Sequence, residues 1–466
     1  MADNEVKTIQ KVKTEENPLG TEPIRKLLRN FAFPSCISMV VNALYNIVDQ
    51  IFIGRGVGYL GNGATNVIMP IMILGIAIGL LFGDGCAAFY SMQLGRKREN
   101  EAAKGVGTAF LGAVLVAVVL DILLNLFLEP FCNLAGATET ILPYAMDYGR
   151  IIAVGLPFSV LSCSLSSIIR ADGSPKYSMA GLLLGCGINV VFDYVFVFPL
   201  GMGVSGAALA TILGQIANTI LYLVYFTRFK HVKITKDIFR IRPAYLGRVC
   251  RLGVSSFVLQ MSVVVVIIVS NKLLVYWGGL SEYGSDIPLA AMGVTMKINN
   301  ILIAIMNGIA AGSLPIIGFN YGAGNLDRVK KTIRMAVGVA MFCGVIATLC
   351  FQLFPEQIVA IFGEESELYV EFGVKCLRIH LMLCILDGLN NVIPTCYQSV
   401  GRPGYAVFCS LMRNLVIAIP VMCIFPFFMG VTGVLMFGPV SAGAAFVMNL
   451  FLSKKIFRDL DRELGK

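Results

Sequence analysis

Long apolar segments alternate with short polar segments along nearly the whole chain of 466 residues. A helix needs about 20 predominantly apolar residues to cross a bilayer. Backbone polar groups cannot stay unpaired in lipid, so helices are the expected form of such segments. Twelve candidate spans cover residues 31–53, 65–93, 105–128, 143–169, 177–199, 204–227, 252–277, 288–318, 334–354, 370–398, 405–428 and 430–453.

Basic residues are concentrated in every second polar gap between these segments. Together with the two tails, this set of gaps holds 30 of the 37 lysine and arginine residues. The other gaps are acidic instead, and Glu129, Glu139 and Glu282 are among their residues. Because basic loops stay in the cytoplasm, we expect an even number of spans, with both termini on the cytoplasmic side of the inner (plasma) membrane.

The composition supports a membrane protein and excludes several other classes. Hydrophobic residues make up 57% of the chain and charged residues 14%, whereas soluble proteins average about 45–50% and about 25%. These values exclude a soluble enzyme. The net charge of +9 is spread over loops and does not indicate nucleic-acid binding. The predicted fold class is an all-α integral membrane protein with twelve transmembrane helices.

The two halves of the chain resemble each other when they are aligned with a constant shift. The turn 170–177 then stands opposite the turn 398–405, and a glycine, a proline and a tyrosine coincide. We call the shift that places position 170 opposite position 398 the repeat offset. Six spans in each half imply parallel repeats, which place a substrate site between them near the membrane midplane.

The repeat also predicts how the chain is divided. We expect a cytoplasmic N-terminal tail (1–30), two pseudo-symmetric six-helix lobes (31–227 and 252–453) joined by a cytoplasmic linker (228–251), and a C-terminal tail (454–466).

No motif in the chain indicates an ATP-driven pump or an enzyme. An ATP-binding loop of the form G-x-x-x-x-G-K-[ST] is absent, and the one Gly-Lys pair is Gly465-Lys466. Two histidines are too few for a histidine-based catalytic or metal cluster. A carrier driven by an ion gradient fits these observations better.

Two aspartates inside apolar segments are the main candidates for a functional site. Asp49 shares a helix face with Asn42 and Asn46, and Asp193 follows Asn189 by one turn. A charged group at membrane depth costs about 2.5–3.5 kcal/mol on insertion scales and requires a partner or a function. Carboxylate and amide oxygens suit Na⁺, and two neighbouring buried carboxyls equally suit a proton. These residues alone therefore do not distinguish Na⁺ from H⁺ as the bound ion.

The two aspartates have no counterpart in the second half. At the repeat offset Val421 stands opposite Asp193, and no acid in the seventh segment corresponds to Asp49. A device that only holds helices together would be expected in both bundles. The asymmetry therefore favours an ion site over a structural role.

Further polar residues inside the segments are candidates for cavity or network positions. Asp84, between two glycines, fits either a cavity wall or a helix kink. We expect Lys297 to pair with Asp387, with contact to substrate as the alternative, and Arg413 to reach the membrane surface or a loop. The full candidate set is Asn42, Asn46, Asp84, Ser166, Ser167, Gln260, Lys297, Asn300, Asp387 and Asn391.

Three motifs resemble those of the multidrug and toxic compound extrusion (MATE) family. They are I-I-G-F-N-Y-G-A-G at 316–324, I-R-A-D-G-S-P-K at 169–176 and N-I-V-D at 46–49. The resemblance spans both halves, residues 31–453. It implies two six-helix lobes around a V-shaped cavity and a multidrug exporter that works by alternating access. Such a transporter antiports organic cations or amphiphilic drugs against Na⁺ or H⁺.

The chain is most similar to the bacterial branch that has a cation site in the N-terminal lobe. The resemblance implies that Asp49, Asn189, Asp193 and Thr211 bind the coupling ion. Many relatives carry an asparagine in the fourth helix where this chain has Ser166 and Ser167.

The resemblance also implies a protein that is not an enzyme and needs no cofactor besides the coupling ion. We expect it to act as a monomer in the lipid bilayer and to contribute to antibiotic resistance. A lipid-linked oligosaccharide flippase of the same superfamily is the alternative. Such flippases commonly have fourteen helices and a cavity lined with arginines, whereas this chain has twelve segments and few arginines at membrane depth.

Overall fold

The structure is a computed structural model that describes residues 17–135, 137, 139–233, 235–360 and 367–463. The predicted tails fall partly outside these ranges, in residues 1–16 and 464–466. All regular structure within the described ranges is helical. The predicted all-α fold class is therefore confirmed.

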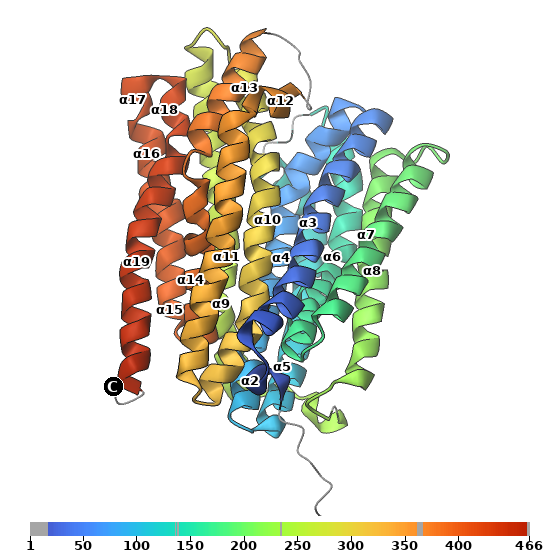
Figure 1. Ribbon diagram of the computed structural model, residues 1–466. Coiled ribbons are helices and arrows are strands. Elements are labelled where there is room, and N and C mark those ends of the chain that lie inside the picture. The colour runs from blue at the N-terminus through green and yellow to red at the C-terminus, as the bar shows by residue number, and fades with distance from the viewer. Residues whose placement is uncertain (1–16, 136, 138, 234, 361–366, 464–466) are drawn as a thin grey trace, which may run out of the picture.

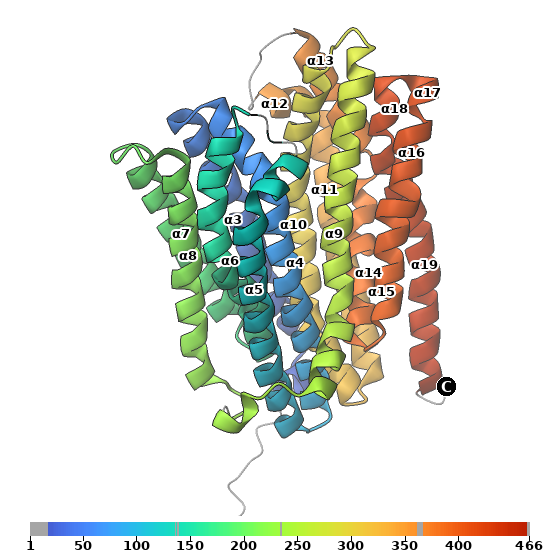
Figure 2. The same cartoon turned by 180° about the vertical axis from the view of Figure 1, so that it is seen from behind.

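The helices of the two halves lie on opposite sides of the molecule (Figures 1 and 2). A short helix, α2 (Pro18–Thr21), precedes the bundle. The first half forms α3 (Ile24–Gly56), α4 (Tyr59–Gly95), α5 (Glu99–Leu134), α6 (Leu142–Ala171), α7 (Pro175–Val197) and α8 (Gly203–Tyr225). The second half forms α9 (Pro243–Gly279), α10 (Asp286–Gly322), α11 (Leu326–Leu353), α12 (Pro355–Ala360), α13 (Glu367–His380), α14 (Asp387–Ser399), α15 (Pro403–Leu411), α16 (Ala418–Ile424), α17 (Pro426–Met429), α18 (Val431–Leu435) and α19 (Phe437–Glu463).

Most predicted segments correspond to one continuous path of helix through the membrane. Eleven helices in the described part of the chain are long and apolar enough to span it. The tenth segment is instead divided into α13 and α14, with a 3₁₀ turn at Cys384–Leu386 between them. Helices also extend beyond the predicted segments. Since α9 begins at Pro243, the connection between the halves is shorter than the predicted range 228–251, and it contains a 3₁₀ turn at Lys236–Ile238.

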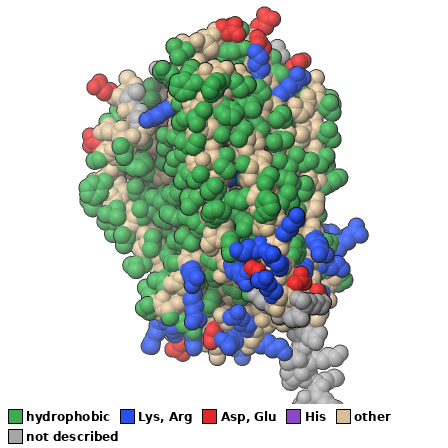
Figure 3. All heavy atoms as spheres, turned by 90° about the vertical axis from the view of Figure 1, so that its left-hand side faces the viewer, with side chains coloured by type: hydrophobic (Ala, Val, Ile, Leu, Met, Phe, Trp, Pro, Cys, Tyr) green, Lys and Arg blue, Asp and Glu red, His purple; other side chains and the backbone are tan. Residues whose placement is uncertain are grey.

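The surface of the bundle is divided into an apolar belt and a basic end. Hydrophobic side chains cover the middle of the face in Figure 3, and lysine and arginine side chains gather toward the lower end. This basic end contains the turns that follow α4, α6, α8, α10 and α14, together with the end of α19. Large hydrophobic side chains such as Leu126, Phe127 and Phe342 are exposed, which suits contact with lipid chains.

The sequence repeat is visible in the backbone. Gly173 and Gly401, which the repeat offset places opposite each other, have φ angles of 82° and 79°, in a region that glycine occupies without a steric cost. In both turns the glycine amide donates to the carbonyl oxygen three residues earlier, at 3.1 Å. Pro175 and Pro403 then begin the next helices. The repeat predicted from the sequence is therefore present in the backbone of these two turns.

The two halves pack tightly against each other in the part of the bundle near the basic end. A Cβ atom added to Gly253 of α9 would overlap the carbonyl oxygen of Leu81 in α4, so the two backbones are in direct contact here. The face of α3 that contains Ile24 and Ser38 is buried, and the next buried side chain of this helix is Ile53. The outer part of α3, which carries Asp49, is therefore less tightly packed than its beginning.

A polar network centred on Asp84 crosses this contact between the halves. The Ser256 hydroxyl of α9 donates to Asp84 Oδ2 at 2.9 Å, and the Ser167 hydroxyl of α6 donates to Oδ1 at 2.8 Å. Arg170, only 5% exposed, donates to Ser167 at 2.7 Å and brings a positive charge close to the carboxylate. Gln398 of α14 donates to Ser256 at 3.3 Å. Asp84 thus links the two halves through Ser256.

The linker between the halves is held at the basic end by a second buried carboxylate. Asp172 is 0% exposed and accepts hydrogen bonds from the hydroxyls of Tyr90 and Tyr225. The backbone amides of Lys230 and His231 donate to the same carboxylate at 2.8 and 3.3 Å. This carboxylate therefore joins the start of the linker to α4 and α8.

Removal of the Ser256 hydroxyl should loosen the halves at the basic end. A hydrogen bond to a charged group contributes about 1.5–3 kcal/mol, so Ser256→Ala should raise the population of molecules with separated halves by about tenfold or more. The measurement is the distance distribution between spin labels at the exposed positions Asn100 and Gly404. The labels should be attached through a non-natural amino acid, since the chain has 13 cysteines.

Ser166→Ala is the matched control for this experiment. Ser166 accepts a bond of 2.7 Å from Arg170 and lies 2.7 Å from the Ser178 hydroxyl, so both contacts stay within the first half. Its loss should leave the distance between the labels unchanged. Identical distance distributions in Ser256→Ala and in the unaltered protein would contradict the role given to the Asp84–Ser256 bond.

Candidate functional site

The four residues that the family resemblance assigns to an ion site lie in neighbouring helices of the first half. Asn189 and Asp193 are on α7 and are 2% and 0% exposed. The carboxyl groups of Asp49 on α3 and Asp193 lie close enough to interact. The Asn189 amide donates to the Thr211 hydroxyl of α8 at 3.3 Å. We call Asp49, Asn189, Asp193 and Thr211 the acidic cluster.

The acidic cluster has an excess of hydrogen-bond acceptors. Asp49 Oδ1, Asn189 Oδ1 and both carboxylate oxygens of Asp193 are buried and make no hydrogen bond of regular geometry within the described residues, although the Asn189 amide and the Asp49 carboxyl lie close to Asp193. A buried acceptor without a donor costs about 1–3 kcal/mol, and more when it is charged. A cation removes this cost, either as Na⁺ bound by the oxygens or as H⁺, which converts a carboxylate into a donor. The oxygen atoms of the cluster are therefore suitable for binding either Na⁺ or H⁺.

Close packing of α7 and α8 brings Asn189 to Thr211. A Cβ atom at Gly214 of α8 would lie 2.5 Å from the carbonyl oxygen of Gly185 in α7. The two helices therefore touch through their backbones, as small residues allow in membrane bundles. Gly185 lies one turn before Asn189, and Gly214 lies just after Thr211, so this contact fixes the spacing of the two polar side chains.

Two tyrosines that the sequence analysis did not single out border the acidic cluster. Tyr45 on α3 and Tyr148 on α6 both interact electrostatically with Asp49 and Asp193. Tyr148 is 1% exposed, so it is part of the protein interior at this site. Tyr45 lies one turn before Asp49 on the same helix, so its place near the site could have been predicted from the sequence. Tyr148 belongs to a different helix, and no local sequence pattern indicates that it lies near Asp49.

The asparagines predicted to share a face with Asp49 are not joined to the acidic cluster by hydrogen bonds within the described part of the chain. Asn46 is exposed, and its amide donates to the backbone carbonyl of Asn42 at 2.6 Å. This contact stays within α3. Gln260, Lys297 and Asn300 are on α9 and α10, and the structure shows no hydrogen bond or ion pair for these three side chains among the residues it describes.

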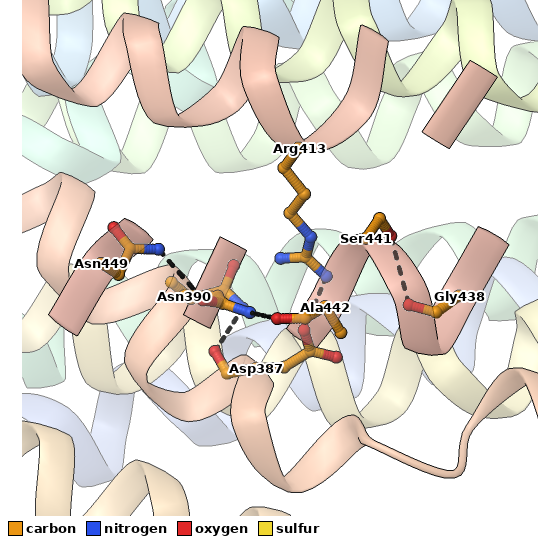
Figure 4. Close-up of polar contacts among 8 residues, drawn as sticks. Asp387, Asn390, Arg413, Gly438, Ser441, Ala442 and Asn449 are labelled. Atoms are coloured by element: carbon orange, nitrogen blue, oxygen red, sulfur yellow. Dashed lines mark hydrogen bonds and ion pairs between the residues drawn. The ribbon is translucent and has the colours of Figure 1, made fainter. Parts of the chain in front are cut away.

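Asp387 pairs with Arg413 and not with Lys297 (Figure 4). Arg413 Nη2 lies 2.6 Å from Asp387 Oδ1, so the expected Lys297–Asp387 pair and the expected outward course of Arg413 are both wrong. The cause is local. Asp387 begins α14 after the break in the tenth segment, and Arg413 lies in a π-helical turn, Met412–Ile417. Both departures from a regular α-helix redirect side chains that a periodic pattern would place elsewhere.

Asparagine side chains lie beside this ion pair (Figure 4). Asn391 donates to the backbone carbonyl of Asp387 at 2.8 Å. Asn390 donates to the carbonyl of Ala442 at 3.1 Å, and Asn449 donates to Asn390 at 3.0 Å. A cavity of about 60 Å³ lies beside them, among α9, α10, α14, α15 and α19. The second half thus contains its own polar site, distinct in charge from the acidic cluster.

Comparison of the sequence with known proteins identifies related exporters. The family model described as MatE matches residues 34–195 and 259–424. The chain is 24% identical over 417 residues to the multidrug export protein MepA of Staphylococcus aureus (strain MSSA476), covering 89% of this chain and 90% of that protein. It is 25% identical over 419 residues to MepA of Staphylococcus haemolyticus (strain JCSC1435), covering 88% and 89%.

Solved structures of transporters share the fold. An outward-facing multidrug resistance MATE family transporter of the MOP superfamily gives a TM-score of 0.90 at 21% identity, over 96% of this chain and 99% of that chain. A MOP superfamily transporter from Pyrococcus furiosus gives the same score and identity over the same shares. A MATE structure in a bent conformation gives 0.87 at 21% identity, over 96% and 98%.

Binding of a cation to the acidic cluster should stabilise the folded protein. A ligand that binds only the native state adds RT ln(1 + [L]/Kd), which is about 2.7 kcal/mol at a hundredfold excess over Kd. The thermal unfolding temperature of the detergent-purified protein should therefore rise with Na⁺ at constant ionic strength, or with H⁺ as the pH falls. The same titrations of Asp193→Asn should give a flat response.

Asp121→Asn serves as the control for this titration. Asp121 is a carboxylate of α5 whose Oδ1 accepts a bond of 2.7 Å from Asn125, and it lies outside the acidic cluster. This variant should respond to the ion as the unaltered protein does. A protein that responds to neither Na⁺ nor H⁺, or an Asp193→Asn variant that responds fully, would contradict cation binding at the cluster.

Proposed function

The chain belongs to the MatE family, and we propose that it is a secondary active exporter that antiports organic cations or amphiphilic drugs against Na⁺ or H⁺. Its MepA relatives are multidrug export proteins. The family membership supports multidrug efflux as the class of transport. The exchange for an ion is supported by the chemistry of the acidic cluster.

The observation that carries this proposal is the set of four buried oxygens that make no hydrogen bond of regular geometry in the described part of the chain. Other carboxylates of the bundle, Asp84, Asp172 and Asp387, each accept hydrogen bonds from protein groups. The acidic cluster holds two carboxylates and no cationic side chain bonds to them within the described residues. A mobile cation is the partner that this arrangement lacks. The ion gradient would then act on the protein at this cluster.

Ion binding would change the forces on α3. Two uncompensated carboxylates repel each other, and an ion between them removes that repulsion. Pro34 lies inside α3 and cannot complete the regular hydrogen-bond pattern, which makes it a site where the helix bends. Because the beginning of α3 contacts α10 of the second half and fewer side chains of its outer part are buried, a change at Asp49 would move the outer part. Ion and drug would then favour opposite states.

We place the basic end in the cytoplasm, following the positive-inside rule. In the described conformation the halves are joined at this end by Ser256 and Asp84. The conformation therefore fits a state that is closed to the cytoplasm and faces outward. The protein would act in the plasma membrane as a monomer, with both termini on the cytoplasmic side.

The arginines at membrane depth argue against the flippase alternative. A lipid-linked pyrophosphate requires several positive charges that are free to bind it. Arg170 is buried and donates to Ser166 and Ser167. Arg413 is already paired with Asp387, so its charge is balanced. These contacts favour drug export over transport of a lipid-linked oligosaccharide.

Loss of either carboxylate of the acidic cluster should abolish gradient-driven export. Asp49→Asn and Asp193→Asn remove the charge that holds the ion but keep the size of the side chain. Both variants should insert and fold at least as well as the unaltered protein, since a desolvated charge has been removed. The measurement is uptake of a fluorescent organic cation by inside-out vesicles under separately imposed Na⁺ and pH gradients.

The same vesicles identify the coupling ion and include their own control. Asp121→Asn removes a carboxylate of the first half that lies outside the cluster, and it should export at the wild-type rate. Wild-type transport by Asp49→Asn or Asp193→Asn at equal expression would refute the assignment of the cluster. The gradient that alone supports transport by the unaltered protein is the coupling gradient.

Ion and drug should compete without sharing ligands. If each favours the opposite-facing state, binding of a fluorescent cation to the purified protein should weaken as Na⁺ or H⁺ is raised, with a Hill slope near one. The weakening should disappear in Asp49→Asn. A drug affinity that neither ion changes in the unaltered protein would exclude this scheme.

A further inference from the structure

Helices α11 and α19 of the second half contact each other at the basic end. Asp461 of α19 forms an ion pair with Lys330 of α11. The guanidinium of Arg334 on α11 lies over the Phe457 ring of α19, at 5.3 Å from the ring centroid. These contacts place the third turn of α11 beside the last turns of α19. We call the contact formed by Lys330, Arg334, Phe457 and Asp461 the α11–α19 seam.

Three cationic side chains at this seam have no acidic partner. Lys454 and Arg458 stand one turn apart on α19, on the helix face that also carries the α19 residues of the seam. Together with Arg334 they are exposed. None of the three forms a hydrogen bond or an ion pair within the described part of the chain. The seam therefore presents positive charges that are free to bind an anion.

Two aspartates close to these cations are already paired. Asp461 is bonded to Lys330, and Asp459 is bonded to Arg402, which precedes α15. Neither carboxylate is therefore available to balance a further cation. Like charges that lie close together repel each other, so an anion from outside the protein would relieve the repulsion within the group of three.

The three cations lie where the exposed apolar surface of the two helices ends. Phe451 is 69% exposed and precedes Lys454 on α19 by less than one turn. Phe342 is 65% exposed and lies about two turns beyond Arg334 on α11. Figure 3 shows the side of the molecule that includes α19, and lysine and arginine side chains there lie directly below the hydrophobic surface. Charged side chains near helix ends reach the membrane surface, so these cations stand at the level of lipid headgroups.

Open space next to the cations suits a lipid chain. Gly338 lies on α11 between Arg334 and Phe342, one turn from each, and a Cβ atom at this glycine would meet nothing within 4 Å. On α19, the small residue Ser453 lies one turn before Phe457. Because residues four apart share a helix face, both small residues lie on the side of the seam. An acyl chain can lie over them while its headgroup contacts the cations.

We propose that the α11–α19 seam binds an anionic phospholipid of the cytoplasmic leaflet, with its phosphate at Arg334, Lys454 and Arg458 and an acyl chain over Gly338. Guanidinium groups match phosphate oxygens through paired hydrogen bonds, and the cytoplasmic leaflet carries the anionic lipids. The site shares no residue with the acidic cluster or the polar cavity. The inference goes beyond the proposed exchange of ion and drug, because the bound lipid would hold the C-terminal helix α19 against α11.

Two lipids with identical acyl chains test the proposal. Phosphatidylglycerol has a net negative headgroup, whereas the ammonium group of phosphatidylcholine cancels the charge of its phosphate. The protein is purified in an uncharged detergent and titrated with each lipid, and the bound lipid is counted by native mass spectrometry. The unaltered protein should bind its first phosphatidylglycerol about tenfold or more tightly than its first phosphatidylcholine. The variant Arg334→Gln/Lys454→Gln/Arg458→Gln should lose this preference, because it lacks the attracting cations.

Arg25→Gln/Arg29→Gln/Lys176→Gln is the matched control. It removes three exposed cations from the basic end of the first half, and it should keep the preference for phosphatidylglycerol. The proposal is overturned by an unaltered protein without a preference, or by a seam variant that retains it. An equal loss in both triple variants would also overturn it, since the attraction would then belong to the whole basic end.

Gly338→Leu tests the place of the acyl chain with all cations present. Leucine fills the open space and is a better helix former than glycine, so this variant should fold. Its binding of phosphatidylglycerol should weaken severalfold. Gly187→Leu fills an equally open position on α7 and should bind the lipid as the unaltered protein does. Unchanged binding in Gly338→Leu would contradict the proposed position of the chain.

Glycerol phosphate separates a lipid from a free phosphate as the ligand. It has the phosphate but no acyl chain, so an excess of it should not displace phosphatidylglycerol from the unaltered protein. Displacement would show that phosphate alone is sufficient and would overturn the assignment to a lipid. None of these measurements requires transport, so their outcome is independent of whether the protein exports drugs.

Discussion

A carboxylate buried in a membrane bundle must be compensated, and the way in which each one is compensated distinguishes the parts of this protein. Asp84 is held by two serines with an arginine close behind. Asp387 is held by an arginine directly. Both are therefore stable without any other partner. The pair Asp49 and Asp193 has buried oxygens that make no hydrogen bond in the described part of the chain, so a bound cation would stabilise this region. The proposed gradient-driven exchange relies on this difference between the ion-free and the ion-bound state.

The repeated architecture carries different chemistry in its two halves. The equivalent turns at Gly173 and Gly401 have the same backbone geometry, because the fold needs the same change of direction in both. The side chains that face the interior are not repeated. Gly185, which lets α7 and α8 touch, corresponds at the repeat offset to Arg413, which lines the cavity of the second half. The first half therefore buries two acidic side chains, and the second half contains a neutral ion pair.

The overall fold could be predicted from the sequence because its determinants are local. Apolar length indicates the spans, and the alternation of basic gaps indicates their direction. The acidic cluster could be located in part, since Asn189 and Asp193 lie one turn apart on one helix. Thr211 required the family resemblance, because it belongs to another helix and no spacing connects it to Asp193. Contacts that depend on irregular backbone or on distant helices could not be predicted.

The tenth segment and the Asp84 network show why such contacts could not be predicted from the sequence. The tenth segment is apolar throughout the part that breaks, and it contains no proline or glycine between His380 and Asp387, so nothing local marks the 3₁₀ turn. The π-helical turn around Arg413 is equally unmarked. The Asp84–Ser256 bond joins residues that are distant in the chain and belong to different halves. Such pairings are decided by the packing of whole helices, which a pattern of polar positions does not contain.

The proposed ion site and the contact between the halves are connected through helix α3. The outer part of α3 carries Asp49, and its beginning is bonded to α10 of the second half through Cys36 and Ile305. The cavity of the second half shares no residue with the acidic cluster, and its Ser256 and Gln398 belong to the contact between the halves. In the proposed exchange, an ion at the cluster would therefore act on the second half through the relative placement of the halves, and it would shift the balance between the states that this contact allows.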